Sequence, residues 1–301
     1  MNTIFLTSCD GLIVARRDGR GWRAELKLNG RPVQAVACDP LRPELVYCGT
    51  FGDGLFRSED TGLTWLPAHI GMSYDKIMSL AVSSVERVDG RGVVYAGTEP
   101  SAVFRSEDGG DRWHELSGLN DLPSSREWSF PPRPQTHHVR HIEPDPHVAG
   151  RLYVAIEAGA LVRTNDAGRT WHDRVPGGPH DTHTLATHPA APNRLYSAAG
   201  DGYFESHDGG DTWQRAGGSR FWGLGQPING PKHGYLWGVA VDPQDPDRIV
   251  VTAALGPRQA HDENGRVGRL PPPSRRALGR NAGGPSFAAR AARRSCGNSP
   301  I

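Results

Sequence analysis

The stretch RSEDTGLTW, residues 57–65, decides the fold because close variants of it recur along the chain. The variants are RSEDGGDRW at 105–113, RTNDAGRTW at 163–171 and ESHDGGDTW at 205–213. In each copy an Asp side chain can accept hydrogen bonds from the amides of a turn, and a Gly two residues later supplies a positive φ. The Trp that follows is expected to pack between neighbouring sheets. The structural residues of these turns are Asp60, Trp65, Asp108, Trp113, Asp166, Trp171, Asp208 and Trp213.

Each acidic turn belongs to a repeated sequence unit, and the pattern of that unit predicts four short β-strands. The unit begins with an apolar run such as 33–38, typical of a strand buried on both faces, and a proline soon after it ends the strand. A second strand such as 45–49 and a glycine-containing turn lead to the third, and the acidic turn leads to the fourth. Four strands in roughly 40 to 50 residues are typical of a β-propeller blade. The 38 glycines and 25 prolines disfavour a helical solenoid of similar period.

The pattern S-x-D-x-G-x-T-W resembles the Asp-box, or BNR, repeat of sialidase-like, sortilin-like and photosystem-assembly-factor-like propellers. The resemblance covers about residues 11 to 255, with Arg112 in place of Thr in the second copy and Thr164 in place of Ser in the third. In that family the box forms an outer turn away from the central channel. The resemblance therefore implies that the repeated turns are scaffold and carry no catalysis.

The repeats predict an all-β propeller of about six four-stranded blades over residues 1–255. Trp22 closes a first blade that begins at its second strand, TIFLTS, and residues 235–255 supply two strands of a sixth. We therefore expect an incomplete ring, whose unclosed blade would favour association. Residues 256–301 form a tail rich in Arg, Pro, Gly and Ala, with a composition typical of disorder. The tail is either a natural basic segment or the product of a reading-frame shift near residue 260.

Charge and hydropathy exclude several classes of protein. The net charge is +1, but nine arginines against two acids give the tail +7, which leaves −6 for the first 255 residues. A mildly acidic body argues against nucleic-acid binding. The sequence has no apolar segment of membrane-span length and no signal peptide at its N-terminus, so we expect a soluble, cytoplasmic protein without membrane contact. The cysteines, Cys9, Cys38, Cys48 and Cys296, lack metal-ligand spacing, and we expect buried free thiols over a disulfide between Cys38 and Cys48.

Unrepeated polar residues gather where the innermost strands begin, which is the mouth of a propeller's channel. Alignment of the units puts Gln34, Met78, Arg140, His183 and Trp237 at one equivalent position. Arg140 suits a carboxylate or phosphate, and Trp237 can stack on a sugar or an aromatic group. The histidines could instead converge on a metal, but their spacing is not diagnostic, so we expect a hydrogen-bonded rim with no metal or cofactor. The predicted ligand-binding residues are Arg140, His141, His183, Trp237, His137, His138 and His180.

Two classes of function compete for this rim. The first is a non-catalytic module that binds a protein or a small polar or anionic ligand. The second is a glycoside hydrolase, sialidase-like or of another Asp-box type. The resemblance implies that a sialidase needs an arginine cluster, a tyrosine nucleophile with a glutamate, and an acid/base aspartate, whereas only Arg140 lies at the start of an inner strand. Other glycosidases use two carboxylates, for which the rim offers Asp75 and Asp181. We expect the binding module.

Overall fold

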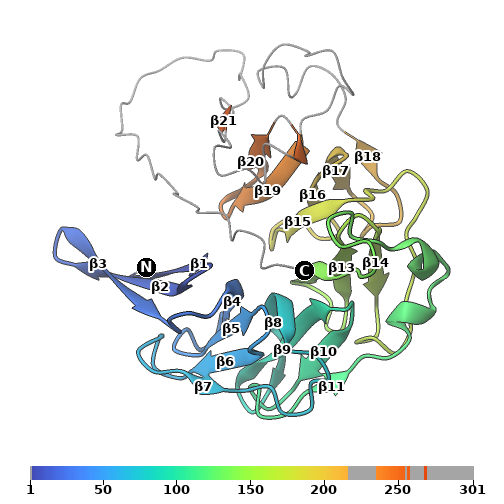
Figure 1. The fold of residues 1–301 in the computed structure, drawn as a ribbon. Helices are drawn as coiled ribbons and strands as arrows, with labels where there is room; N and C mark the ends of the chain where they lie inside the picture. The colour runs from blue at the N-terminus through green and yellow to red at the C-terminus, as the bar shows by residue number, and fades with distance from the viewer. Residues whose placement is uncertain (1, 216–234, 255, 258–267, 270–301) are drawn as a thin grey trace, which may run out of the picture.

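The described residues form six antiparallel sheets that follow one another around a common centre (Figure 1). The structure is a computed structural model and describes residues 2–215, 235–254, 256–257 and 268–269. Strands that are consecutive in the chain pair with each other within every sheet, so each sheet is an up-and-down meander. This arrangement is a β-propeller, and it confirms the predicted all-β fold with about six blades.

The innermost strand comes first in the sheets that follow the first one, and these strands face the centre in Figure 1. The first sheet contains β1 (Thr3–Ser8), β2 (Gly11–Asp18) and β3 (Gly21–Lys27). The next two contain β4 (Val33–Cys38), β5 (Val46–Thr50), β6 (Leu55–Ser58) and β7 (Leu66–Pro67), then β8 (Lys76–Val88), β9 (Arg91–Glu99), β10 (Val103–Ser106) and β11 (His114–Glu115). The last three contain β12 (Val139–Pro144), β13 (Leu152–Ile156) and β14 (Ala160–Thr164); β15 (Thr182–Thr187), β16 (Leu195–Ala199), β17 (Gly202–Ser206) and β18 (Gln214–Arg215); and β19 (Tyr235–Asp242), β20 (Asp245–Ala254) and β21 (Gly268–Arg269).

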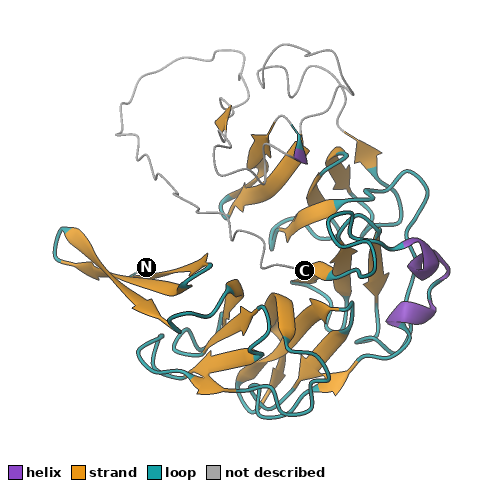
Figure 2. Ribbon diagram, in the orientation of Figure 1, coloured by secondary structure: helices purple, strands orange, loops and turns teal. Residues whose placement is uncertain are grey.

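The longest connection between two blades in the described chain runs from β11 to β12 and carries two short 3-10 helices, η1 (Leu119–Asp121) and η2 (Pro123–Glu127), drawn in purple in Figure 2. It delivers Arg133, His137 and His138 to the start of β12. No helix in the described part of the chain has the length and apolarity needed to cross a membrane.

Five apolar clusters join the six sheets in pairs. One joins Leu12 of β2 to Val33 of β4, and the next joins Tyr47 of β5 to Phe104 of β10. Each of the remaining three clusters also joins two neighbouring sheets. The first contains residues of β9 and β13, the second of β13 and β16, and the third of β16 and β19. Because both faces of a middle sheet are covered, β5, β9, β13 and β16 read as nearly continuous apolar runs.

The acidic turns make the hydrogen bonds that their sequence predicts. Asp60 accepts bonds from the amides of Leu63 and Thr64, both at 2.9 Å, and from the Thr64 hydroxyl at 2.6 Å. The Ser58 hydroxyl donates to Asp60 and accepts from the amide of Gly62, each at 2.7 Å, and Gly62 has a φ of +84°. The side chain thus replaces water for amides that point into the turn.

The departures from the pattern change these bonds in the expected way. Thr164 takes the place of the serine and makes the same two hydroxyl bonds, to Asp166 and from the amide of Gly168. Arg112 replaces the threonine of the second copy, and there Asp108 keeps the bond from the residue's amide at 3.0 Å. The hydroxyl bond of the other three turns has no counterpart at that position, since arginine carries no hydroxyl.

We expect Asp208→Ala to lower the free energy of unfolding by about 1–2 kcal/mol, because it removes the acceptor for the Thr212 hydroxyl and amide. Urea denaturation would measure the loss, with the exposed Asp18→Ala as a control that stays within about 0.5 kcal/mol of wild type. The Thr212 bonds lower the pKa of Asp208 to about 2, so its contribution is present above about pH 4 and is lost as the pH falls toward 2. A constant difference down to pH 2 would contradict this account.

Each of the four tryptophans after an acidic turn packs against the preceding sheet, as predicted. Trp65 joins the cluster around Leu12, and Trp113 is 2% exposed and donates from its indole to the carbonyl of Ala68 at 2.8 Å. Trp171 and Trp213 pack against the third and fourth sheets in the same way. Trp22 differs, because it is 51% exposed and lies outside the apolar cluster that joins the first two sheets.

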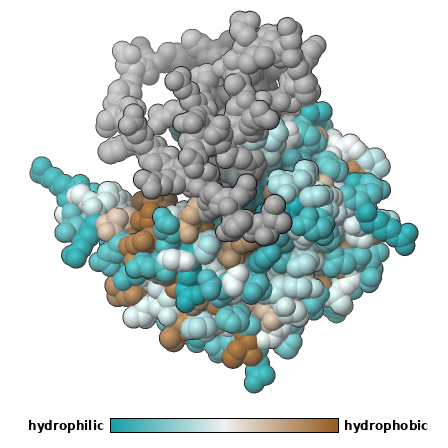
Figure 3. Space-filling view, in the orientation of Figure 1, coloured by the Kyte–Doolittle hydropathy of each residue, from teal (hydrophilic) through white to brown (hydrophobic). Residues whose placement is uncertain are grey.

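The first sheet has three strands, as expected of a blade that begins at its second strand. Its exposed large apolar side chains include Ile4, Leu6, Trp22 and Leu26. Figure 3 shows hydrophobic patches that interrupt a mostly hydrophilic face of the molecule. The predicted tail, 256–301, lies outside the described residues apart from 256–257 and 268–269.

The two cysteines in the second sheet are free thiols, as expected. Cys48 on β5 lies opposite Val36, and Cys38 lies opposite Val46, so the register keeps the two sulfurs apart. Cys48 is buried, and burial raises the pKa of its thiol to about 12. Cys38 is exposed, which corrects the expectation that both are buried, because it lies at the end of β4.

Candidate functional site

A β-bulge marks the same position near the start of five successive innermost strands. The register shifts by one residue in β4, β8, β12, β15 and β19, and each shift leaves one residue without an opposite partner. Bulges re-aim a side chain relative to the regular strand. The five bulge residues are Gln34, Met78, Arg140, His183 and Trp237, the same set that the alignment of the units selects.

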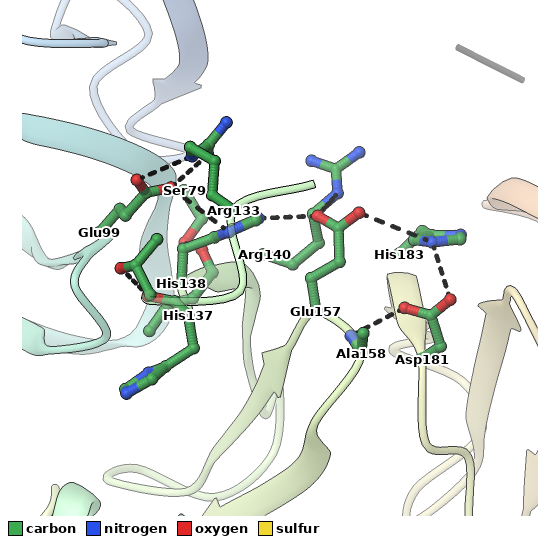
Figure 4. A network of polar contacts seen from close by, with 12 residues as sticks. Ser79, Glu99, Arg133, His137, His138, Arg140, Glu157, Ala158, Asp181 and His183 are labelled. Carbon is green, nitrogen blue, oxygen red and sulfur yellow. Dashed lines mark hydrogen bonds and ion pairs between the residues drawn. The ribbon is translucent and has the colours of Figure 1, made fainter. Parts of the chain in front are cut away.

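Glu157 is the centre of a buried polar network at this rim (Figure 4). It follows β13 directly and is 5% exposed. Its Oε2 lies 2.7 Å from Nε2 of His138 and 3.3 Å from Nε of Arg140, and its Oε1 lies 4.0 Å from Nε2 of His183. Burial by itself would raise the pKa of Glu157, but the His138 hydrogen bond and the charges of Arg140, His138 and His183 outweigh it and lower the pKa to about 2. The carboxylate is therefore ionised at neutral pH.

Glu99 extends the network toward the third sheet. It ends β9, is buried, and pairs with Arg133 and, at 3.5 Å, with Lys76. Nδ1 of His138 lies 3.6 Å from Glu99, so His138 stands between the two glutamates (Figure 4). Buried charges are costly unless they are paired, and both glutamates meet that condition.

Arg140 is a partly exposed member of the network. Its guanidinium lies 4.9 Å from the centre of the Trp237 ring, and its side chain is 24% exposed. The contact with Glu157 is an ion pair through Nε without hydrogen-bond geometry. The terminal Nη groups donate no hydrogen bond to another described residue, which leaves them available to a ligand.

His183 connects the network to the fifth and sixth sheets. It is buried, and its Nδ1 donates to the carbonyl of Leu236 at 2.6 Å, which leaves Nε2 as the nitrogen that faces the rim. The Tyr235 hydroxyl lies 3.0 Å from Nε2, and Asp181 Oδ2 lies 3.5 Å from it. The other oxygen of Asp181 accepts a bond from the amide of Ala158 at 2.8 Å.

The structure brings some of the predicted site residues together and leaves others apart. His138, Arg140, His183, Trp237 and Asp181 share one network, as described above. His137 packs edge-on against the Trp128 ring, and burial lowers its pKa. His141 lies 3.5 Å from Glu143 on β12, and His180 is exposed. Asp75 is exposed, and only its backbone carbonyl is bonded, to the amides of residues 52 and 54. No contact joins Asp75 to Asp181 among the described residues, and their catalytic role stays a prediction.

Sequence reasoning missed Glu99 and Glu157, the two acids on which the network depends. Each stands at the end of an apolar strand, in VVYAGTE and LYVAIE, where the sister repeats have Phe51 and Gly200. A carboxylate at the end of a buried run must find a partner, and that was the available signal. Both glutamates lie where the second strand of a sheet ends, whereas the predicted site residues lie in or before the innermost strands.

No family model and no curated protein matches this chain. Among solved structures, it is similar to a GH74 xyloglucanase from Xanthomonas campestris, with 18% identity over 85% of this chain and 43% of the enzyme, at a TM-score of 0.58. It is also similar to a chain of the nidogen/laminin complex, with 11% identity over 84% of this chain and 86% of that chain, at a TM-score of 0.55. The WD40 propeller of Doa1 is similar as well, with 14% identity over 89% of this chain and 78% of that chain, at a TM-score of 0.55. This chain spans less than half of the GH74 enzyme. At these identities the likeness supports the propeller fold, which enzymes and binding domains share.

Proposed function

We propose that this propeller is a binding module whose rim recognises a carboxylate or phosphate group, carried by a protein partner or a small polar ligand. The observation that carries the proposal is the position of Arg140. Trp237 supports one face of its guanidinium, Glu157 holds Nε, and the Nη groups stay open. A planar guanidinium held in this way can form two parallel, charge-assisted bonds to an anion.

The acids of the rim do not oppose such a ligand, because cations neutralise them. Glu99 is paired with Lys76 and Arg133, and Glu157 with Arg140. Counting Asp181, three carboxylates face three permanent cations, so the network has no net negative charge even with neutral histidines. An incoming anion therefore meets a balanced rim with one open guanidinium.

The scaffold supports the same function. The acidic turns resemble Asp-box repeats in sequence, and each holds its Asp by hydrogen bonds within the turn, so we propose that the chain belongs to that superfamily. Those turns lie apart from the rim network, which leaves recognition to unrepeated side chains. One of the structurally similar chains comes from a nidogen/laminin complex, and the proposed binding role is consistent with that use of the fold.

We expect Arg140→Lys to weaken anion binding at least tenfold, because an ammonium lacks the planar fork and stacks poorly on Trp237. Titration with acetate, glucuronate and inorganic phosphate, followed by tryptophan fluorescence, would measure the dissociation constants. Arg23→Lys, at a side chain that is 75% exposed, is the matched control and should bind as wild type. Equal affinities in Arg140→Lys and wild type would refute the proposal.

A glycoside hydrolase remains the second candidate, favoured by the fold shared with a GH74 enzyme and by the approach of Glu157 and Asp181 to one histidine. A screen with chromogenic glycosides would decide between the two. Turnover that is lost in both Glu157→Gln and Asp181→Asn, but kept in Asp75→Asn, would establish the hydrolase and overturn the binding module. The low pKa of Glu157 suits a nucleophile or base and excludes it as the general acid at neutral pH.

A further inference from the structure

Three side chains of the rim turn one ligand atom each toward a common point. The atoms are Oε1 of Glu157, Oδ2 of Asp181 and Nε2 of His183, and ligand atoms of the three residues lie within 4.8 Å of one another. We propose that they form a binding site for a divalent transition-metal ion, with Mn²⁺ and Zn²⁺ as the ions that the donor set fits. The proposal does not depend on anion binding by Arg140.

The separations between these atoms are too long for hydrogen bonds and close to those around a metal. His183 Nε2 lies 3.5 Å from Asp181 Oδ2 and 4.0 Å from Glu157 Oε1, beyond the ~2.7–3.2 Å of an N–H···O bond. Bonds of about 2.0–2.2 Å to one ion place neighbouring ligands about 3.0–3.5 Å apart. Shifts of less than about 1 Å would bring each of the two oxygens to that distance from Nε2.

Each of the three proposed metal-ligating side chains is held in its orientation by a hydrogen bond to its other polar atom. The Leu236 carbonyl accepts the Nδ1 proton of His183 at 2.6 Å, so the lone pair of neutral His183 is on Nε2. The Ala158 amide holds the other oxygen of Asp181 at 2.8 Å, and His138 holds the other oxygen of Glu157 at 2.7 Å. Each ligand therefore has one atom engaged and one atom directed at the same point (Figure 4). Such outer contacts are typical of metal-ligating histidines and carboxylates.

The donor set selects the class of ion. Two carboxylates and one imidazole balance a divalent charge, and imidazole suits Zn²⁺ and other transition metals. Ca²⁺ takes six to eight oxygen ligands, more than this site supplies. The Tyr235 hydroxyl, 3.0 Å from Nε2, competes for the same lone pair, so a bound ion replaces that hydrogen bond.

The experiment is calorimetric titration of the whole chain with ZnCl₂ and MnCl₂, together with metal analysis after dialysis. We expect one ion per chain in wild type and at least a tenfold loss of affinity in Asp181→Asn, which keeps an oxygen for the Ala158 amide. Asp75→Asn removes an exposed carboxylate outside the cluster and should bind as wild type.

His183→Gln is the second variant, and it decides the question if Asp181→Asn does not fold, as judged by thermal unfolding. We expect the same loss of at least tenfold. The absence of Zn²⁺ and Mn²⁺ uptake at millimolar concentration by wild type would overturn the proposal. So would an affinity in the two variants equal to that of Asp75→Asn, since surface histidines would then account for the binding.

Discussion

Glu157→Gln is expected to lower the free energy of unfolding by about 3 kcal/mol, one of the two largest effects that the structure predicts for a single substitution. The change keeps the size of the side chain and removes only its charge. Glu157 is 5% exposed, and it faces His138 at 2.7 Å and Arg140 at 3.3 Å. Without the carboxylate, the cation of Arg140 loses its buried partner, and such a loss costs more than the pair itself contributes.

The pH dependence of this effect has a defined sign. Folding lowers the pKa of Glu157 from its usual 4.5 to about 2, so its contribution is complete above about pH 4.5 and is lost as the pH falls toward 2. The stability difference between wild type and Glu157→Gln should therefore narrow between pH 5 and pH 3, as measured by urea denaturation. Glu59→Gln, at a side chain that is 57% exposed and paired with Arg57, should cost less than about 1 kcal/mol. If both variants lost the same free energy of unfolding, the charge of Glu157 would not be what stabilises the network.

The scaffold was predictable from sequence because its chemistry is local and repeated. Each hydrogen bond of the Asp60 turn joins residues that are at most four positions apart. The hydroxyl, the carboxylate, the glycine and the tryptophan can therefore be recognised in one short stretch of sequence, residues 58–65. The repetition of the unit then predicts the propeller, because equivalent strands of each unit occupy equivalent positions in successive blades. The same logic selected Arg140, His183 and Trp237, since an aligned position in each unit becomes an aligned position around the centre.

The partners of these rim residues could not be predicted in the same way. Glu157 meets His138, 19 residues away, only because β13 returns beside β12, and it meets His183 only across the boundary between two sheets. Asp75 was also expected at the rim, as a carboxylate in a loop before an innermost strand. It lies just before β8, and its side chain is exposed. Contacts between unrepeated residues on different blades depend on loop conformation, and the repeat carries no information about it.

Trp113→Ala is expected to lower the free energy of unfolding by about 3–5 kcal/mol, the usual cost of removing a buried aromatic side chain. Trp113 is 2% exposed and fills the boundary between the second and third sheets, where it contacts the cluster that contains Tyr47 and Phe104. Its indole also donates to the carbonyl of Ala68 at 2.8 Å, so the variant leaves that carbonyl without its partner. Urea denaturation followed by circular dichroism would measure the loss.

Trp22→Ala provides the matched control, because Trp22 stands in the first sheet with 51% of its surface exposed. It should change stability by less than about 1 kcal/mol, since most of the apolar surface it would remove is already in contact with water. If the tryptophans of the acidic turns act by joining successive sheets, Trp65→Ala should fall between the two, because Trp65 is only partly buried in its cluster. A loss in Trp22→Ala as large as in Trp113→Ala would mean that burial between sheets is not what these residues contribute.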